Sequence, residues 1–279
     1  MSITSVGKFS VLKQLGTGAN STILHISRQE DGRQYALKVV PIDSAEDMKF
    51  LEQAEHEFRV AQMLDHPNLI KIFCLEKQTN WLRKVKKVQL LIEYVNGETL
   101  DKVPALAVKK LVALFVQVAA GLVHMHRRNV LHADLKPSNI MANSRTGQAK
   151  VIDYGLAWIK GESKGRIQGT PEYMAPETIT NGFVNEKTDI FNFGATMYRL
   201  VTFRLPPSLM PTPGGVRLNG KAYTQMLKPV VECNPLAPPA LGDLIHRCLE
   251  YHSEQRPERM SEIQGTLDRL ADELGPVDE

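Results

Sequence analysis

The first part of the chain alternates apolar and polar residues, a pattern that predicts short β-strands. Phe9–Leu15 and Thr22–Ser27 follow this pattern, and the segment between them, Gly16–Ser21, contains two glycines and predicts a turn. Another strand is predicted at Tyr35–Val40, after the turn-forming segment Glu30–Arg33. These segments indicate strands that succeed one another through short turns.

A helical pattern follows these strands. Apolar residues recur at intervals of three and four residues within Asp43–Leu64, which predicts an amphipathic helix. The helix should end before Pro67, because the residue before a proline avoids helical dihedral angles. Strands are then predicted at Leu69–Phe73 and Val88–Val95. We therefore expect residues 1–95 to form a small, mostly antiparallel lobe of five strands and one main helix.

The remainder of the chain, residues 96–279, has longer apolar repeats that predict a larger and mostly helical lobe. Two short strands are expected at Ile140–Met141 and Ala149–Ile152, and the proline-rich segment Arg204–Pro239 should form a loop with at most short helices. The predicted helices are Val108–Arg127, Asp189–Thr202, Leu241–Tyr251 and Met260–Leu274. The expected fold class is α+β, with two lobes.

Composition excludes several classes of protein. The 34 basic and 31 acidic residues give a net charge of +3, which is too small to indicate nucleic-acid binding. Three distant cysteines form no disulfide framework and no zinc-binding spacing, so we expect reduced thiols in the core. The N-terminus lacks the apolar run of a signal peptide. The most apolar segment, Leu111–Val123, is too short to span a bilayer. We expect a cytoplasmic location, either alone or as the cytoplasmic part of a longer, membrane-anchored protein.

A basic segment separates the last two predicted strands of the small lobe. Lys77 and residues 83–87, with Arg83, Lys84, Lys86 and Lys87, should lie at a hairpin tip. The simpler interpretation is a solvated turn, and the alternative is a docking patch for an acidic partner.

The segment Val130–Asn139 carries the most suggestive chemistry. Asp134, Lys136 and Asn139 lie within six residues, and Pro137 makes a continuous helix unfavourable there. A carboxylate can accept a hydroxyl proton, an ammonium can contact a phosphate, and an amide oxygen can bind Mg²⁺. Taken alone, the same three residues would also fit a solvated turn.

Other motifs are equally ambiguous when each is considered alone. The glycine-rich turn fits a plain hairpin or a phosphate-binding loop. Lys38, within an apolar strand, fits a solvent-facing position or an anion contact, and either Glu55 or Glu57 could pair with it. Asp153, at a strand end before Tyr154 and Gly155, fits a metal ligand or an ordinary turn.

The order of these motifs resembles the catalytic domain of a serine/threonine protein kinase, over about residues 9–270. The resemblance rests on the glycine-rich hairpin, Lys38, Glu57, the H-x-D-x-K-x-x-N loop, D-x-G, A-P-E and the late Arg256. It implies a bilobal kinase fold with a hinge near residues 93–97, and it implies ATP and protein substrates. The ATP-binding residues would be Gly16, Gly18, Ser21, Ile23, Ala36, Lys38, Glu57, Ile92, Glu93, Val95 and Met141.

The resemblance also implies catalytic and structural roles. Asp134 would be the base and Lys136 the γ-phosphate contact, while Asn139 and Asp153 would hold Mg²⁺, with Mn²⁺ as a substitute. Lys136 and Thr170 match the serine/threonine form. Supporting roles would fall to His132, Ala133, Tyr154, Gly155, Thr170, Glu177, Asp189 and Arg256, with Glu177 and Arg256 forming an ion pair and Asp189 bracing the catalytic loop.

Two departures from the family pattern matter. Ala133 replaces an arginine that in the family binds a phosphate on the activation segment, so catalysis should not depend on such a phosphate through this contact. The candidate phosphorylation sites are Ser163 and Thr170. Tyr154 replaces the usual phenylalanine, and its hydroxyl needs a partner.

Three functions remain open at this point. An active protein kinase is favoured because Lys38, Asp134 and Asp153 are all present. A nucleotide-binding, pseudokinase-like scaffold usually lacks one of them. A small-molecule kinase is disfavoured by the A-P-E segment and the Glu177/Arg256 pair. The catalytic loop and the compact activation segment resemble bacterial kinases of the eukaryotic type.

Overall fold

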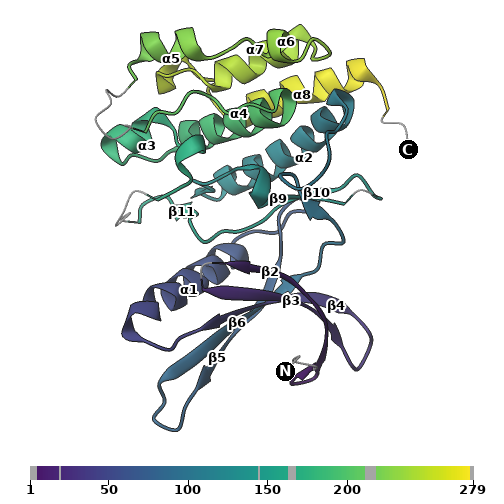
Figure 1. Ribbon diagram of the computed structural model, residues 1–279, viewed down its shortest axis with the longest axis vertical. Helices are drawn as coiled ribbons and strands as arrows, with labels where there is room; N and C mark the ends of the chain where they lie inside the picture. The colour runs from purple at the N-terminus through teal and green to yellow at the C-terminus, as the bar shows by residue number, and fades with distance from the viewer. Residues whose placement is uncertain (1–4, 19, 144, 163–167, 211–217, 277–279) are drawn as a thin grey trace. The chain divides into compact units, whose positions relative to one another are not determined.

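A six-stranded antiparallel sheet dominates the N-terminal part of the computed structural model (Figure 1), which describes residues 5–18, 20–143, 145–162, 168–210 and 218–276. The strands run in the order β1-β2-β3-β4-β6-β5. They are β1 Ser5–Val6, β2 Phe9–Gly18, β3 Ser21–Arg28, β4 Gln34–Pro41, β5 Ile72–Thr79 and β6 Val85–Glu93. The predicted antiparallel lobe is confirmed, but the count of five strands is wrong, because β1 is too short to produce a visible alternation.

Two boundaries in this sheet differ from the sequence prediction. β5 begins at Ile72 rather than at Leu69, which is buried before the strand starts. β5 then continues to Thr79 through polar residues that pair with β6 by backbone hydrogen bonds, with one side-chain hydrogen bond from Gln78 to Gln89 at 2.9 Å. Lys77, Lys86 and Lys87 therefore lie in or beside the ladder, and only Asn80–Lys84 forms the tip. Side-chain alternation could not reveal a strand with polar residues on both faces.

The predicted helix Asp43–Leu64 is shorter in the structure. A 3₁₀ turn at Ala45–Asp47 precedes α1, which spans Met48–Gln62. The Asp47 carboxylate accepts hydrogen bonds from the backbone amides of Asp43 and Ser44, at 3.1 and 2.9 Å, and these bonds hold the tighter first turn.

The strand register sorts the sheet into two faces. One face contains the apolar cluster of Leu24, Ile26 and Leu37. On the other face, Ile23 lies opposite Lys38, and Ala36 lies opposite Ile92. Four residues that the sequence assigns to nucleotide binding therefore share one face of the sheet.

Contacts divide the chain into two units. The first comprises residues 1–65, 69–96 and 153–155, and the second comprises residues 66–68, 97–152 and 156–279. The second unit is mostly helical, as predicted (Figure 1). Its helices are α2 Val108–Arg127, α3 Pro176–Asn181, α4 Glu186–Thr202, α5 Gly220–Met226, α6 Val230–Cys233, α7 Pro239–Cys248 and α8 Met260–Leu274.

Short strands and 3₁₀ turns complete the second unit. The predicted strand pair Ile140–Met141 and Ala149–Ile152 is present as β9 and β10. The strands are β7 Glu98–Thr99, β8 Val130–Leu131, β9 Ile140–Ala142, β10 Ala149–Val151 and β11 Trp158–Ile159. The 3₁₀ turns are Pro137–Asn139, Pro171–Tyr173 and Ser253–Gln255.

Helix α2 has the predicted bounds and lies in the core of the second unit. By length and composition alone this 20-residue helix could cross a membrane, because it extends beyond the shorter apolar segment Leu111–Val123 considered in the sequence. Most of its apolar window, 61%, is buried inside the protein, and Phe115 packs edge-to-face against Phe193 of α4 at 6.1 Å between ring centroids. These contacts are those of a core helix.

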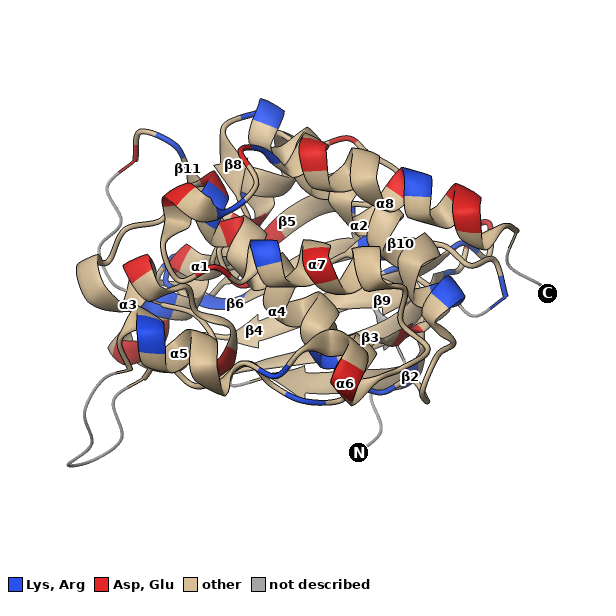
Figure 2. Ribbon diagram, turned by 90° about the horizontal axis from the view of Figure 1, so that it is seen from above, with Lys and Arg blue, Asp and Glu red and all other residues tan. Residues whose placement is uncertain are grey.

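Helices α4 and α7 pack closely at one point. A Cβ atom added to Gly194 would lie 2.6 Å from the Cβ of Cys248, so only glycine fits there. Cys248 is buried and burial raises the pKa of its thiol to about 12, whereas Cys74 is exposed and Cys233 is half-buried. The expectation of core thiols therefore holds for Cys248 alone. Farther out, α7 and α8 carry charges of both signs (Figure 2).

Candidate active site

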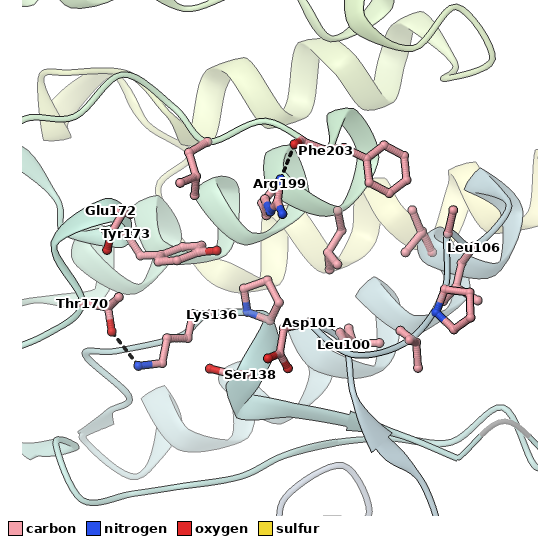
Figure 3. A pocket seen from close by; sticks show the side chains of 17 residues that line it. Leu100, Asp101, Leu106, Lys136, Ser138, Thr170, Glu172, Tyr173, Arg199 and Phe203 are labelled. Atoms are coloured by element: carbon pink, nitrogen blue, oxygen red, sulfur yellow. Dashed lines mark hydrogen bonds between the residues drawn. The ribbon is translucent and has the colours of Figure 1, made fainter. Parts of the chain in front are cut away.

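Asp134, Lys136 and Thr170 form a closed polar triangle in the second unit. The Lys136 ammonium lies 2.9 Å from Oδ2 of Asp134. It also donates to the Thr170 hydroxyl at 2.5 Å, a contact that Figure 3 shows. The backbone N–H of Thr170 donates to Oδ1 of Asp134 at 2.7 Å. Each carboxylate oxygen of Asp134 is therefore held by one contact, Oδ1 by the Thr170 amide and Oδ2 by the Lys136 ammonium.

The turn that presents Asp134 is strained, and Asp189 of α4 stabilises it. Ala133 has φ of 64°, a left-handed conformation that is costly for a residue with a Cβ. Asp189 is fully buried and accepts from the backbone amides of His132 and Ala133, at 2.9 and 2.8 Å. The two peptide N–H groups of the turn therefore share one carboxylate.

His126, on the last turn of α2, supplies a third contact to this carboxylate. Its Nε2 lies 2.8 Å from Oδ2 of Asp189. Burial alone would raise the pKa of Asp189, but hydrogen bonds from His126 and the Ala133 amide lower it below its ordinary value. His126 was not predicted as a site residue, because neither of the two histidines in the last turn of α2 shows from the sequence which group it contacts.

Asn139 is fixed by the loop itself. Its side-chain amide nitrogen donates to the backbone carbonyl of Asp134 at 2.8 Å. Since the nitrogen is used within the loop, the amide oxygen is the atom suited to a metal. Pro137 begins the 3₁₀ turn that carries Asn139, so the proline sets the local geometry.

Lys38 and Glu57 meet in the first unit. Nζ of Lys38 lies 2.7 Å from Oε2 of Glu57, which is buried on α1, whereas Glu55 pairs with Lys77. Burial alone would lower the pKa of Lys38, but the carboxylates of Glu57 and Asp153 outweigh it and raise that pKa. Lys38 therefore stays charged and the choice between the two glutamates is resolved.

The D-Y-G segment is also held within the first unit. Asp153 has φ of 67°, and its Oδ1 accepts from the Gly155 amide at 3.0 Å. The Tyr154 hydroxyl finds its partner in the carbonyl of Ile70, at 3.0 Å. A Cβ on Gly155 would lie 2.6 Å from Nε2 of Gln53 on α1, which is the end of an exposed side chain that can move, and 3.1 Å from Oδ1 of Asp153.

The glycine-rich hairpin is formed by β2 and β3. A Cβ on Gly18 would lie 2.8 Å from the Ser21 hydroxyl oxygen, whereas one on Gly16 would meet no atom within 4 Å. The contact at Gly18 is with the end of a side chain that can rotate away, and no contact within the protein requires glycine at position 16. The glycine at position 16 leaves open space above the backbone.

Of the remaining residues predicted to bind the nucleotide, Glu93 and Val95 lie in the first unit and Met141 lies in the second. Glu93 ends β6, its amide donates to the Lys71 carbonyl at 2.9 Å, and Val95 follows it in the first unit. Tyr94 stacks on His25 with ring centroids 3.8 Å apart. Met141 lies on β9 in the second unit.

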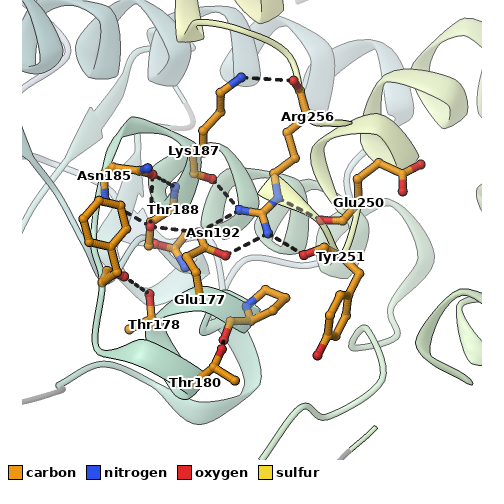
Figure 4. Close-up of polar contacts among 12 residues, drawn as sticks. Glu177, Thr178, Thr180, Asn185, Lys187, Thr188, Asn192, Glu250, Tyr251 and Arg256 are labelled. Atoms are coloured by element: carbon orange, nitrogen blue, oxygen red, sulfur yellow. Dashed lines mark hydrogen bonds and ion pairs between the residues drawn. The ribbon is translucent and has the colours of Figure 1, made fainter. Parts of the chain in front are cut away.

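Glu177 and Arg256 form the expected ion pair, although they are 79 positions apart in the chain (Figure 4). Two parallel hydrogen bonds of 2.8 and 2.9 Å join the guanidinium and the carboxylate. Arg256 also donates to the carbonyls of Lys187, Glu250 and Tyr251 and packs over a phenylalanine ring. The pair ties the A-P-E segment to the region before α8.

A pocket of about 540 Å³ adjoins Lys136 and Thr170 within the second unit (Figure 3). Its far wall is apolar, and its centre carries the Tyr173 hydroxyl with Arg199 and Asp101 nearby. Burial, together with the charges of Glu172 and Asp101, raises the pKa of Tyr173 to about 12. The apolar wall includes Leu100, Leu106, Leu200, Phe203 and Leu205. This pocket was not predicted from the sequence, because its residues come from separate loops and from helices α2 and α4.

Of the two candidate phosphorylation sites, Ser163 lies outside the described residues. Thr170 is described, and its hydroxyl accepts the hydrogen bond from Lys136. Its position is that of a structural contact to the loop that carries Asp134 and Lys136.

Comparisons with known proteins agree with this arrangement. The model of the family described as protein kinase domain matches residues 9–266. A probable serine/threonine-protein kinase of Streptomyces coelicolor is 26% identical over 94% of this chain and 40% of its own length. The serine/threonine-protein kinase pkn2 of Myxococcus xanthus is 27% identical over 94% of this chain and 32% of its own.

A third relative, the serine/threonine-protein kinase PrkC of Bacillus subtilis, is 27% identical over 72% of this chain and 31% of its own length. This chain therefore spans about a third to two fifths of the length of these curated relatives.

Proposed function

This chain belongs to the protein kinase domain family, and we propose that it transfers the γ-phosphate of ATP to serine and threonine hydroxyls of protein substrates. The observation that carries the proposal is the triangle of Asp134, Lys136 and Thr170, with its contacts of 2.5–2.9 Å. A carboxylate held by two donors beside a fixed ammonium suits proton acceptance next to a phosphate.

In the proposed reaction, a new bond forms between the substrate hydroxyl oxygen and the γ-phosphorus of ATP, and the bond to the β-phosphate oxygen breaks to release ADP. Asp134 orients the hydroxyl and accepts its proton. Lys136 neutralises charge on the phosphoryl group as it moves. Little covalent chemistry is required of the protein, so alignment and charge provide most of the rate enhancement.

The residues proposed for the metal fit Mg²⁺ by their chemistry. Asn139 and Asp153 offer only oxygen atoms, the ligands that this hard cation prefers, and Mn²⁺ accepts the same set. The described residues contain no cluster of three or more histidine, cysteine, aspartate or glutamate side chains around a common point. Two protein ligands suit Mg²⁺, which keeps several waters and binds substrate phosphates. When bound, Mg²⁺ supplies positive charge that neutralises and aligns those phosphates.

We assign the nucleotide to the sheet face that carries Lys38. Ile23, Ala36 and Ile92 share this face with Lys38 and provide an apolar surface for the adenine. The ion pair with Glu57 keeps the lysine extended and charged, as a phosphate contact requires. The open backbone at Gly16 leaves room for a phosphate to approach.

A polypeptide substrate is favoured over a small molecule. The pocket of about 540 Å³ beside Lys136 combines an apolar wall with charged groups, which suits the side chains that flank a phosphorylated residue. The alternative of a pseudokinase-like scaffold has less support, because the lysine and both aspartates that such proteins lose are present.

The proposal is tested by comparing the native protein with Asp134→Asn, using Mg-ATP and a generic basic protein as substrate. Asn keeps the shape but accepts no proton, so phosphate incorporation should fall by about 10²–10⁴-fold. The matched control is Asp268→Asn, an exposed residue on α8 that should have full activity.

Phosphoamino-acid analysis should find phosphate on serine and threonine. Equal incorporation by the native protein and Asp134→Asn would contradict the proposal. Binding of nucleotide, seen as a thermal shift, without turnover in either protein would favour the scaffold.

A further inference from the structure

The tip of the β5–β6 hairpin, residues Asn80–Lys84, exposes two large apolar side chains next to each other. Trp81 is 87% exposed and Leu82 is 53% exposed. The hairpin projects beyond the neighbouring strands of its sheet (Figure 1). Adjacent exposed apolar residues at a projecting turn mark an interaction surface more strongly than scattered ones do.

The tip is held rigidly in this outward conformation. The side-chain oxygen of Asn80 accepts from the backbone amides of Leu82 and Lys84, at 3.0 and 2.9 Å. Backbone bonds of 2.9 Å join Asn80 to Lys84 and Arg83 to Asn80, and Arg83 adopts a left-handed conformation with φ of 59°. These bonds fix the backbone of the tip, from which the Trp81 side chain extends into solvent.

The charge around the tip is strongly biased. The eleven residues Lys77–Lys87 contain five basic and no acidic residues. The rest of the chain has 29 basic against 31 acidic residues, a net charge of −2. Only Lys77 of the five has an ion pair among the described residues, with Glu55. The segment is a basic patch on a chain that is otherwise slightly acidic.

We propose that the hairpin tip docks on an anionic lipid surface, with Trp81 and Leu82 inserted at the level of the headgroups and the basic residues binding lipid phosphates. Tryptophan favours this interface, since its ring has an apolar body and one polar N–H. Basic residues just behind an apolar apex add electrostatic attraction, with each contributing roughly a fivefold gain in partitioning.

An acidic protein partner fits the same charge but not the shape as well. It would need a cavity formed around a projecting indole, whereas a lipid surface accepts a convex apolar tip of any outline. The proposal is independent of the catalytic assignment, because the tip residues contribute no side chain to the proposed active site.

The chain itself offers a spectroscopic test, because its only tryptophans are Trp81 and Trp158. In a Trp158→Phe variant, Trp81 is the sole indole emitter, and it starts exposed to water. Circular dichroism should first establish that this variant is folded. Vesicles of phosphatidylcholine with phosphatidylglycerol should then shift the Trp81 emission to shorter wavelength, and brominated lipids should quench it. Vesicles of phosphatidylcholine alone should have no such effect.

Vesicle sedimentation of proteins that retain Trp158 separates the electrostatic contribution of the basic residues from the apolar contribution of Trp81 and Leu82. Arg83→Gln with Lys84→Gln removes two charges and keeps the backbone bonds, so partitioning should fall about 25-fold. Trp81→Ala with Leu82→Ala should weaken binding and leave its dependence on salt intact.

The matched controls are Lys13→Gln with Lys110→Gln, which removes two exposed charges elsewhere, and Leu236→Ala, which removes another exposed apolar residue. Both controls should bind like the native protein.

Three outcomes would overturn the proposal: no emission shift with anionic vesicles, equal partitioning of tip and control variants, or binding to soluble polyglutamate without binding to vesicles. The last result would assign the tip to an acidic protein instead.

Discussion

At the scale of single residues, Asp189 connects the sequence most directly to the chemistry. One buried carboxylate accepts hydrogen bonds from two consecutive backbone amides and from His126, and so stabilises a left-handed turn at Ala133. Asp134 follows directly, so the direction of the carboxylate that we propose as the base depends on a residue that lies 55 positions later in the sequence.

Asp189→Asn should lower both stability and activity. The substitution replaces one carboxylate oxygen by an N–H₂ group, which must face an N–H donor and cannot accept its hydrogen bond. We therefore expect the free energy of unfolding to fall by about 3 kcal/mol. Denaturant unfolding at neutral pH measures this change. Because the turn at Ala133 loses its acceptor, the rate of phosphate transfer should fall as well.

The pH dependence tests the cause of this loss. The pKa of Asp189 is lowered in the folded protein, so its stabilisation is complete above the unfolded value of about 3.9 and is lost as pH falls through the lower folded value. The stability difference between the native protein and Asp189→Asn should therefore shrink below about pH 4. A difference that stays constant down to that pH and below it would contradict this explanation.

Single residues were predictable from the sequence where a motif fixed their order along the chain. Asp134, Lys136 and Thr170 were expected to work together, and they meet within 3 Å. His126 and Tyr173 were not found, because their importance comes from neighbours that only the folded chain supplies. The partner of the Tyr154 hydroxyl, the carbonyl of Ile70, was also invisible, since any of many carbonyls could have accepted it.

At the scale of elements, helices with a periodic apolar face were predicted correctly from the sequence. The bounds of α2 and α8 agree with the prediction, because their apolar stripes are long and end at polar or glycine residues. Strands were less certain. β5 was misplaced, since it pairs through its backbone while its side chains from Glu76 to Thr79 are polar. Hydrophobic patterns report burial, and a strand that is exposed on both faces leaves no such signal.

Two helical glycines provide a test of packing between elements. Gly194→Ala in α4 would place a Cβ 2.6 Å from that of Cys248, so the free energy of unfolding should fall by about 1–3 kcal/mol. Gly265→Ala in α8 is the matched control, since its Cβ would meet no atom within 4 Å. The control should raise stability by about 0.5–1 kcal/mol through the helix propensity of alanine. Equal effects of the two substitutions, measured by thermal denaturation, would refute the close contact of α4 with α7.

At the scale of the whole molecule, Ala133 bears on how the protein is controlled. The side chain is buried and ends at its Cβ, so it offers no cation to a phosphate on the activation segment. We predict that protein treated with phosphatase, and shown by mass spectrometry to carry no phosphate on this segment, keeps its catalytic rate. The native phosphorylated protein is the reference. Inactivity after dephosphorylation, with recovery when a segment phosphate is restored, would contradict the prediction.

The α+β class and the small antiparallel lobe followed from the sequence, because the change from alternating to helical patterns near residue 96 is strong. The discontinuous make-up of the first unit did not follow. Asp153–Gly155 belongs to it through contacts of Tyr154 and Gly155 with residues more than 80 positions earlier, and local patterns contain no information on such contacts.

The pair of Glu177 and Arg256 has a consequence for the order of events during synthesis. A ribosome adds about 5–20 residues per second, so the 79 positions between them take roughly 4–16 seconds to translate. Throughout that interval the nascent A-P-E segment lacks Arg256, the partner that Glu177 has in the folded protein. The segment that contains Thr170 is thus made early but anchored late, and the proposed activity would require that nearly all of the helical unit has left the ribosome.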